Sequence, residues 1–302
     1  MPQTVSGPGT FNVPAAGSLR AAPSQIETVG YYWAMQDGSN NMSAPNGRDC
    51  SRAAASEGEC SWSHATSAFI QNSWKHPDRW TSNSTAWDVQ DVLQLGNVNV
   101  TSIVSVSHVF VAFSANGSGY VLLPNYEASW AAYLHELQAS GALQHITAWY
   151  PADEPDIKMD VAALNTIVHV LKRDTPHINV LVTLSSLAVP PFAAGTSQRF
   201  NISAVSPEVD VITMDIYCAY SVVHKQQPAC QILWPTMLAK LEGLASFAAQ
   251  NKGTQLAVIP DATLTTTSTI GAAAQRTLND LFLTWCSNQA ACTAVLPFVG
   301  GQ

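Results

Sequence analysis

The sequence predicts a single α/β domain built as a (β/α)8 TIM barrel, and three observations support that fold. From residue 146 onward, β-prone runs alternate with segments of helical periodicity, as is typical of parallel strands joined by crossover helices. The 302 residues, of which 47% are hydrophobic, are enough for one barrel with a large core. No Gly-x-Gly-x-x-Gly fingerprint follows a predicted strand, which argues against an open dinucleotide-binding sheet.

The chain divides into a short arm and the barrel. Residues 1–25 are rich in Ser, Pro, Gly and Ala and are expected to form an N-terminal arm, with the barrel occupying residues 26–302. The first strand is expected at about 28–35. It is followed by a long polar insert over about 37–64, a length that is usually either functional or disordered.

The remaining elements follow from hydrophobic periodicity. Further strands are expected at about 98–112, 146–150, 179–184, 209–217, 255–259 and 293–298. Helices are expected at about 64–74, 85–95, 126–140, 159–172, 234–250 and 268–285. Seven strands are evident, and the eighth is obtained if the region 98–112 divides into two.

The most informative stretch is the end of the strand at 146–150. Two prolines there bracket Asp153 and Glu154, so the strand stops and two carboxylates lie at its carboxyl end, where α/β folds build their sites. Trp149 and Tyr150 directly precede the carboxylates. Carboxylates beside flat apolar rings suit a sugar, whose leaving oxygen needs a proton. Helix capping by either acid is the alternative interpretation.

A second acidic position lies within the strand at 209–217. Ile212, Met214 and Ile216 alternate with Thr213, Asp215 and Tyr217, so Asp215 is predicted to point into the barrel if the apolar set faces the helices. A buried Asp is costly unless it is solvated or paired, which makes Asp215 a candidate site residue or a structural one.

Two further residues are less constrained by pattern. Asp261 follows Pro260 at the end of the next strand, and it either faces the same mouth or caps the following helix. His108 ends an apolar run and either lines the mouth or is a core histidine with satisfied hydrogen bonds. The predicted substrate-binding residues are Tyr32, Trp33, His108, Trp149, Tyr150, Asp153 and Tyr217.

The span 146–217 resembles the central part of TIM-barrel glycoside hydrolases, in particular the clan of β-galactosidases, cellulases and mannanases. That clan carries its general acid/base in a strand-four Asn-Glu-Pro motif, and Asp153-Glu154-Pro155 stands in that place here. The segments Arg173-Asp174-Thr175-Pro176-His177 and Asp215-Ile216-Tyr217 follow in the order seen in glycosidase-like sequences. The clan's strand-seven Glu nucleophile has no counterpart, because no Glu follows Glu242. The resemblance therefore implies Glu154 as the acid, with Asp215 or Asp261 as its partner.

The cysteines and glycosylation sequons favour an oxidising, secretory compartment. The six cysteines form three pairs that are local in sequence, and pairing within each is the simplest expectation: Cys50–Cys60, Cys218–Cys230 and Cys286–Cys292. The first of these would pin the insert after the first strand. Five Asn-x-Ser/Thr sequons begin at Asn41, Asn83, Asn99, Asn116 and Asn201. The sequence begins without an apolar leader, so the expected secretion implies a mature form or a fragment.

Composition excludes several other classes of function. The formal net charge is −8 with only 13 Lys and Arg, so nucleic acid is not an expected partner. No apolar run is long enough to span a membrane. No metal-ligand spacing or cofactor motif is present, and we expect neither a metal nor a cofactor. A monomer is expected.

The leading hypothesis is a secreted glycoside hydrolase that cleaves a polysaccharide or oligosaccharide by two-carboxylate acid/base catalysis. The alternative is a catalytically inactive barrel that binds a glycan or a protein at a cell surface, which the missing strand-seven Glu favours. The geometry of the carboxylates distinguishes the two, because an enzyme requires two of them facing one cleft.

Overall fold

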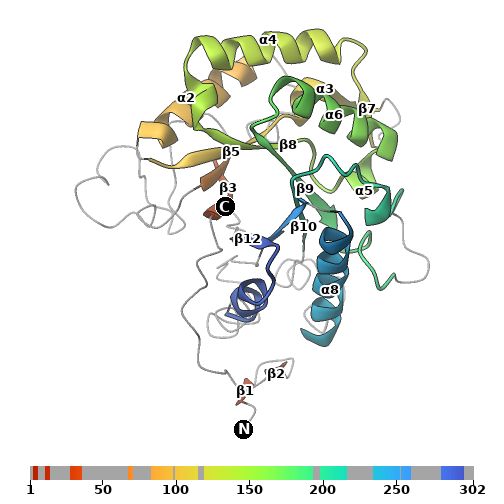
Figure 1. Cartoon of the computed structure of the whole chain (residues 1–302). Helices are drawn as coiled ribbons and strands as arrows, with labels where there is room; N and C mark the ends of the chain where they lie inside the picture. The colour runs from red at the N-terminus through yellow and green to blue at the C-terminus, as the bar shows by residue number, and fades with distance from the viewer. Residues whose placement is uncertain are drawn as a thin grey trace.

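The computed structural model places a parallel sheet at the centre of an α/β fold (Figure 1). The structure describes residues 3–5, 11–13, 28–35, 67–70, 83–97, 99–114, 119–192, 198–215, 234–251, 253–259 and 280–295. The central strands are β3 (Thr28–Met35), β4 (Ser67–Ile70), β5 (Thr101–Ser105), β8 (Ile146–Tyr150), β9 (Asn179–Ser185), β10 (Val211–Asp215), β11 (Gln255–Val258) and β12 (Cys292–Val295).

Each central strand pairs in parallel with both of its neighbours. The pairing order is β10-β11-β12-β3-β4-β5-β8-β9, and β9 pairs with β10 in turn, so the eight strands form a closed ring. Parallel strands share one direction, so all their carboxyl ends lie at the same rim of the ring. Within this order β9 separates β8 from β10, which sets the spacing between residues at the ends of those two strands.

Helices lie around the outside of the sheet (Figure 1). They are α2 (Asn83–Asn97), α3 (Ser107–Phe110), α4 (Tyr126–Ala139), α5 (Pro155–Lys158), α6 (Val161–Asp174), α8 (Trp234–Gln250) and a helix over residues 280–287, with 3-10 turns at η3 (Ala142–His145) and η4 (Ile202–Ala204). Two antiparallel hairpins complete the described structure, β1 (Gln3–Val5) with β2 (Phe11–Val13) and β6 (Val111–Phe113) with β7 (Tyr120–Leu122).

The apolar core has two parts, one inside the ring and one between the ring and the helices. The inner cluster comes from the central strands and the residue after β11: Ile103, Ala148, Tyr150, Leu181, Val211, Ala257, Ile259 and Ala294. The outer cluster combines strand residues, including Ile212 and Met214, with residues of the helices. Because strand side chains alternate between faces, Asp215 shares the inner face with Val211. The predicted direction of Asp215 is thus confirmed.

Two predicted elements are wrong. Residues 67–70, expected within a helix, form β4, which pairs in parallel with β3 and β5. A run of four residues is too short to reveal a period, so pairing with the neighbouring strands decides its conformation. The region 98–112 does not divide into two central strands, because after β5 the chain turns through α3 into the β6–β7 hairpin. β4 therefore supplies the missing strand, and β8 remains the fourth.

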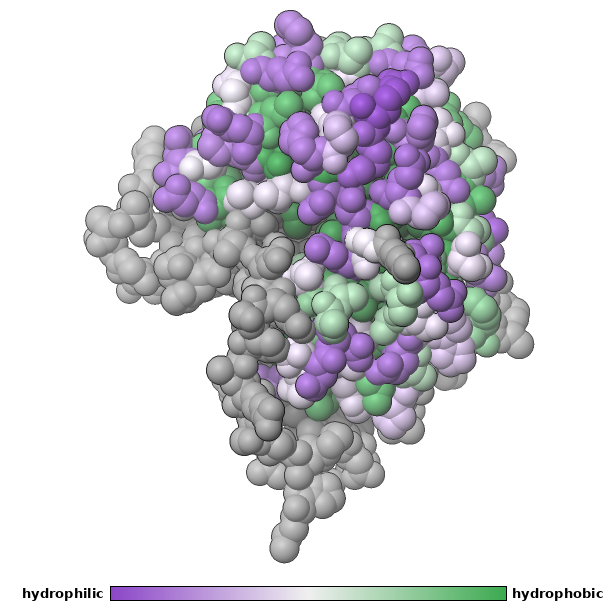
Figure 2. Space-filling model, viewed as in Figure 1, coloured by the Kyte–Doolittle hydropathy of each residue, from purple (hydrophilic) through white to green (hydrophobic). Residues whose placement is uncertain are grey.

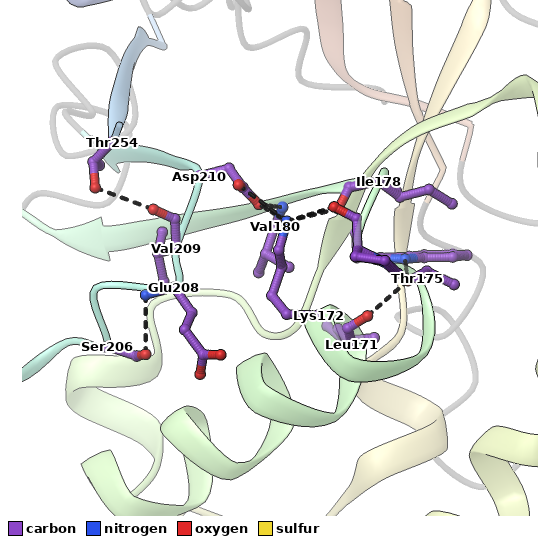
Figure 3. Close-up of polar contacts among 12 residues, drawn as sticks. Leu171, Lys172, Thr175, Ile178, Val180, Ser206, Glu208, Val209, Asp210 and Thr254 are labelled. Carbon is purple, nitrogen blue, oxygen red and sulfur yellow. Dashed lines mark hydrogen bonds and ion pairs between the residues drawn. The ribbon is translucent and has the colours of Figure 1, made fainter. Parts of the chain in front are cut away.

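At the amino ends of β9 and β10, a polar cluster joins the strands to α6 (Figure 3). Lys172 donates to both carboxylate oxygens of Asp210, at 3.1 and 2.9 Å, and to the carbonyl of Pro176. Asp210 also accepts a hydrogen bond from the backbone N–H of Val180. This cluster fastens one end of the sheet and lies opposite the carboxyl ends, where a site is expected.

The outer surface, the carboxyl-terminal region and the lengths of the helices add three observations. Hydrophilic residues gather over the upper helices on the face shown in Figure 2, with hydrophobic residues between them. Cys286 and Cys292 form a disulfide that joins the helix at 280–287 to β12, which confirms that predicted pair. Among the helices of the described ranges, none is long and apolar enough to cross a membrane.

Candidate active site

Glu154 lies at the carboxyl end of β8, as predicted, and its backbone is strained. Its φ of 43° and ψ of 59° fall in the left-handed region, which costs a residue with a side chain about 1–2 kcal/mol. Pro155 follows directly and begins α5, and a residue before proline is disfavoured in the right-handed helical region. Glu154 precedes α5, but its side chain makes no capping hydrogen bond. Capping alone does not explain this conformation.

The carboxyl groups of Asp153 and Glu154 share one lysine. Lys158, one helical turn later in α5, places its Nζ 2.5 Å from Oδ2 of Asp153 and 3.6 Å from Oε2 of Glu154. Oδ1 of Asp153 accepts a hydrogen bond of 3.1 Å from the hydroxyl of Tyr150. Asp153 is therefore held from two sides, whereas the Glu154 side chain remains 21% exposed and accessible from solvent.

This environment shifts the protonation of Glu154. Burial, reinforced by the negative charge of Asp153, raises the pKa of Glu154 to about 7, although Lys158 opposes the rise. Burial alone would lower the pKa of Lys158, but the carboxylates of Asp153 and Glu154 outweigh it and the net pKa is raised. At neutral pH, Glu154 is thus protonated in a large share of molecules, while Lys158 stays charged. A carboxyl group in this state can donate a proton.

The loop after β8 is fastened to β9 through Asp156. The carboxylate of this fully buried residue accepts hydrogen bonds from the backbone N–H of Ser185 at 2.7 Å and from its hydroxyl at 2.5 Å. Ser185 in turn pairs with Asp215 across the β9–β10 ladder, and Asp153 bridges to Thr183 on the other side of β9. The end of β9 therefore lies between the acidic segment of β8 and Asp215.

Strand spacing fixes the separation of the two acidic positions. Neighbouring strands lie about 4.8 Å apart, so the backbones at the ends of β8 and β10 are roughly 10 Å apart across β9. Asp215 is only 3% exposed and faces the inside of the ring. The fold thus brings Glu154 and Asp215 to one rim, separated by a single strand.

Two predicted substrate-binding aromatics are wrong. Trp149 is fully buried in the outer core, where it packs edge-on against Trp130 and donates a hydrogen bond to the hydroxyl of Thr175. Tyr150 is fully buried inside the ring and supports Asp153 through its hydroxyl. Adjacent strand residues point to opposite faces, so the pair could not line one cleft.

The prediction that His108 binds substrate is also wrong. It lies in α3, with its Nε2 3.6 Å from Oδ2 of Asp88 and its ring edge-on to Tyr133. Tyr133 donates a 2.7 Å hydrogen bond to Asp88. Burial lowers the pKa of His108 to about 4, so the ring is neutral at neutral pH. His108 therefore belongs to the helix layer, as a core histidine would, but neither of its ring nitrogens has a hydrogen-bond partner among the described residues, so the expected satisfied hydrogen bonds are not seen.

Several predicted residues fall outside the described parts. Asp261, Tyr217, Cys50, Cys60, Cys218 and Cys230 lie outside the described residues. Tyr32 and Trp33 lie in β3, and nothing is described of their side chains. Among the described residues, no group of three or more His, Cys, Asp or Glu side chains is arranged so that it could hold a metal ion.

Lys158 is the site residue that sequence reasoning missed. Its signal was present, since Glu154 and Lys158 are four residues apart, a spacing that brings side chains together on a helix. Four residues of α5 were too few to show a helical period, so the spacing went unrecognised.

Comparisons with known proteins give similarity in shape only. No family model matches the chain, and no curated protein matches it either. Among solved structures, a xylanase from Paenibacillus barcinonensis is 14% identical with a TM-score of 0.49, over 90% of this chain and 83% of that one. A GH30 endoxylanase from Clostridium papyrosolvens C71 is 12% identical with a TM-score of 0.48, over 91% of this chain. This chain spans 65% of that endoxylanase's length.

The structural matches also include a different type of enzyme. A citrate synthase variant is 11% identical with a TM-score of 0.41, over 90% of this chain and 86% of that one. At such identities and TM-scores, these similarities identify neither the reaction nor the reacting residues of this chain.

Proposed function

We propose that this chain is a secreted glycoside hydrolase that cleaves a polysaccharide or oligosaccharide with Glu154 as its general acid. The observation that carries the proposal is the carboxyl group of Glu154, which lies at the carboxyl-end rim with its pKa raised to about 7. An acid catalyst works best when its pKa lies near the working pH. Lys158 and Tyr150 hold the neighbouring Asp153, so the proton-donating role falls to Glu154.

Asp215 is the proposed second carboxylate. It is buried on the inner face of β10, and one strand separates it from the end of β8. In inverting glycosidases, the carboxyl groups lie about 6.5–9.5 Å apart, with a water between them. Backbone separation by two strand spacings suits that arrangement, so we favour inversion. Asp261, which follows the next strand in sequence, is the substitute if Asp215 proves inert.

Other features complete the proposal. The chain would form a monomeric (β/α)8 domain, with an N-terminal arm and a disulfide-pinned insert between β3 and β4. Secretion and glycosylation are supported by the cysteines and the five sequons, and the Cys286–Cys292 disulfide agrees with an oxidising compartment.

The test is hydrolysis of a panel of glycans by the wild type and by Glu154→Gln. We expect the variant to keep its fold and to lose at least about 100-fold in rate, the lower scale for a general acid. Glu208→Gln is the matched control, because Glu208 is an exposed carboxylate beside His169, and its rate should not change. Hydrolysis of the best substrate by Glu154→Gln at the wild-type rate would remove Glu154 from catalysis.

A second candidate, a barrel that binds glycan without cleaving it, rests on a specific observation. No Glu follows Glu242, so the strand-seven nucleophile of the resembling clan has no counterpart. Binding of a panel glycan by the wild type, with no product released after prolonged incubation, would favour this candidate.

A further inference from the structure

The β6–β7 hairpin carries an open aromatic ring. Phe113 and Tyr120 are directly opposite each other in the hairpin, with ring centroids 4.7 Å apart and planes tilted by 43°. Phe113 is 55% exposed, whereas Tyr120 is only 8% exposed. The Tyr120 ring therefore supports one side of a Phe113 ring that faces solvent.

This hairpin rests on the acidic segment of the candidate site. Gly119 has a φ of 143°, and a Cβ at this position would lie 2.1 Å from the carbonyl oxygen of Lys158. The same Cβ would lie 2.8 Å from Nη2 of Arg199. Such close approach is open only to glycine, so the backbone at 119 is in contact with the end of α5.

The charges of the same groups act on the Tyr120 hydroxyl. Burial raises the pKa of Tyr120, while the charge of Lys158 lowers it and that of Asp153 raises it further. These influences fall off with distance, so Lys158 and Asp153 lie near the tyrosine. Only the ring of Tyr120 thus separates Phe113 from Lys158 and Asp153, the residues that surround Glu154.

Other exposed apolar side chains in the described part of the chain offer comparisons. Val121 is 49% exposed and lies on the opposite face of the same hairpin, because strand side chains alternate. Phe192 is also 49% exposed, on the loop after β9, where Lys240 donates hydrogen bonds to the carbonyls of Val189 and Pro191. Single exposed apolar residues are common. What distinguishes Phe113 is its position above Tyr120 and next to the acidic segment.

We propose that Phe113, supported by Tyr120, forms a sugar-binding subsite beside Glu154, where its ring stacks on the C–H face of one sugar unit of a glycan chain. This inference rests on the proposed function for its class of ligand. Flat aromatic rings supply large, rigid contact area at low cost in side-chain entropy, and binding sites combine them with a few placed polar groups. Here the polar groups are the carboxylates and Lys158.

The experiment measures glycan binding by affinity electrophoresis in gels that contain each glycan of the panel. Every protein carries Glu154→Gln to prevent turnover, and Phe113→Ala is added to it. Loss of the ring contact should weaken binding by up to about tenfold, which corresponds to about 1.4 kcal/mol. Phe113→Trp should retain binding, because it restores a flat ring. The matched control is Val121→Ala, which removes an equally exposed apolar side chain from the other face and should leave binding unchanged.

The outcomes separate this inference from the proposed function. Retardation of Phe113→Ala equal to that of its parent would overturn the subsite, and so would a parent that no glycan retards. If Phe113→Ala weakens retardation while Glu154→Gln alone hydrolyses glycans normally, the subsite stands and the acid assignment fails. Equal melting temperatures for all variants would exclude unfolding as the cause of any loss.

Discussion

Two lysine–aspartate pairs lie at opposite ends of the same sheet, and they differ in how completely the charges are satisfied. At the amino ends, Lys172 and Asp210 bind each other and surrounding backbone groups (Figure 3). At the carboxyl end of β8, Lys158 is shared between Asp153 and Glu154. The first arrangement fastens strands to a helix, whereas the second leaves one carboxyl group with a displaced pKa.

The difference shows how a fold separates stability from chemistry. Lys172 meets two carboxylate oxygens and the carbonyls of Pro176 and Ile178, so its charge is fully used in local contacts. Glu154 combines a left-handed backbone, partial burial and a nearby like charge, each of which costs free energy. Unfavourable features that collect at one residue of the carboxyl-end rim indicate function, whereas the mutual contacts of Lys172 and Asp210 indicate a structural role.

The largest expected effect is on the pH dependence of stability. The pKa of Glu154 is about 7 in the folded state, against an ordinary value of 4.5 for a glutamate, so the folded state holds this proton more tightly. This contribution to stability is fully present below pH 4.5 and is lost as pH rises through 7. Glu154→Gln removes the titration, so it should be more stable than the wild type by as much as about 3 kcal/mol at pH 8 and equally stable at pH 4. Urea unfolding at both pH values measures this.

The control for that measurement is Glu208→Gln, which changes an exposed carboxylate 3.4 Å from the ring of His169. Its difference from the wild type should remain small between pH 4 and 8. A constant difference between Glu154→Gln and the wild type at both pH values would show that the pKa of Glu154 is not raised.

The next effect concerns Asp215, the proposed partner of Glu154. Asp215→Asn should lower hydrolysis of the best panel glycan by at least about 100-fold, which corresponds to about 2.7 kcal/mol. Asp210→Asn removes a carboxylate from the opposite end of the sheet and should keep the wild-type rate per folded molecule. Normal turnover by Asp215→Asn would transfer the role to Asp261.

A smaller effect is expected at the structural pair. Lys172→Met should lower the free energy of unfolding by about 1–3 kcal/mol, because Asp210 loses a charged hydrogen-bond donor in a partly buried site. Its hydrolysis rate per folded molecule should match the wild type. A loss of activity without a loss of stability would mean that the two ends of the sheet are not separable.

The smallest effect is expected for the lysine at the candidate site. The charge of Lys158 lowers the pKa of Glu154, so Lys158→Met should raise this pKa further. The alkaline limb of the pH–rate profile should then move to higher pH, while Lys158→Arg, which keeps the charge, should leave it in place. An unmoved limb in Lys158→Met would show that Lys158 serves only to hold Asp153.

The sequence was sufficient to predict the structure where a residue pattern extended over several positions. Alternation over 211–215 correctly predicted that Asp215 faces inward, and Pro151, the first of the two prolines around Asp153 and Glu154, correctly marked the end of β8. Among the four-residue elements, β11 and β12 were predicted as strands, whereas β4 and α5 were not predicted. The burial of Trp149 and Tyr150 also escaped prediction, since their contacts come from α4 and from the interior of the ring.

The position of β9 between β8 and β10 has a consequence for how such a catalyst could change over evolution. If Glu154 and Asp215 are the reacting pair, the distance between their carboxyl groups is set by the number of strands between them and not by the lengths of their side chains. Exchanging Asp for Glu changes the reach by a single methylene. A different stereochemical course would instead require the second carboxylate to arise on another strand. The choice between inversion and retention would then depend on the strand order, which homologous proteins share. Substitutions at individual rim positions would change the preferred substrate before they changed the mechanism.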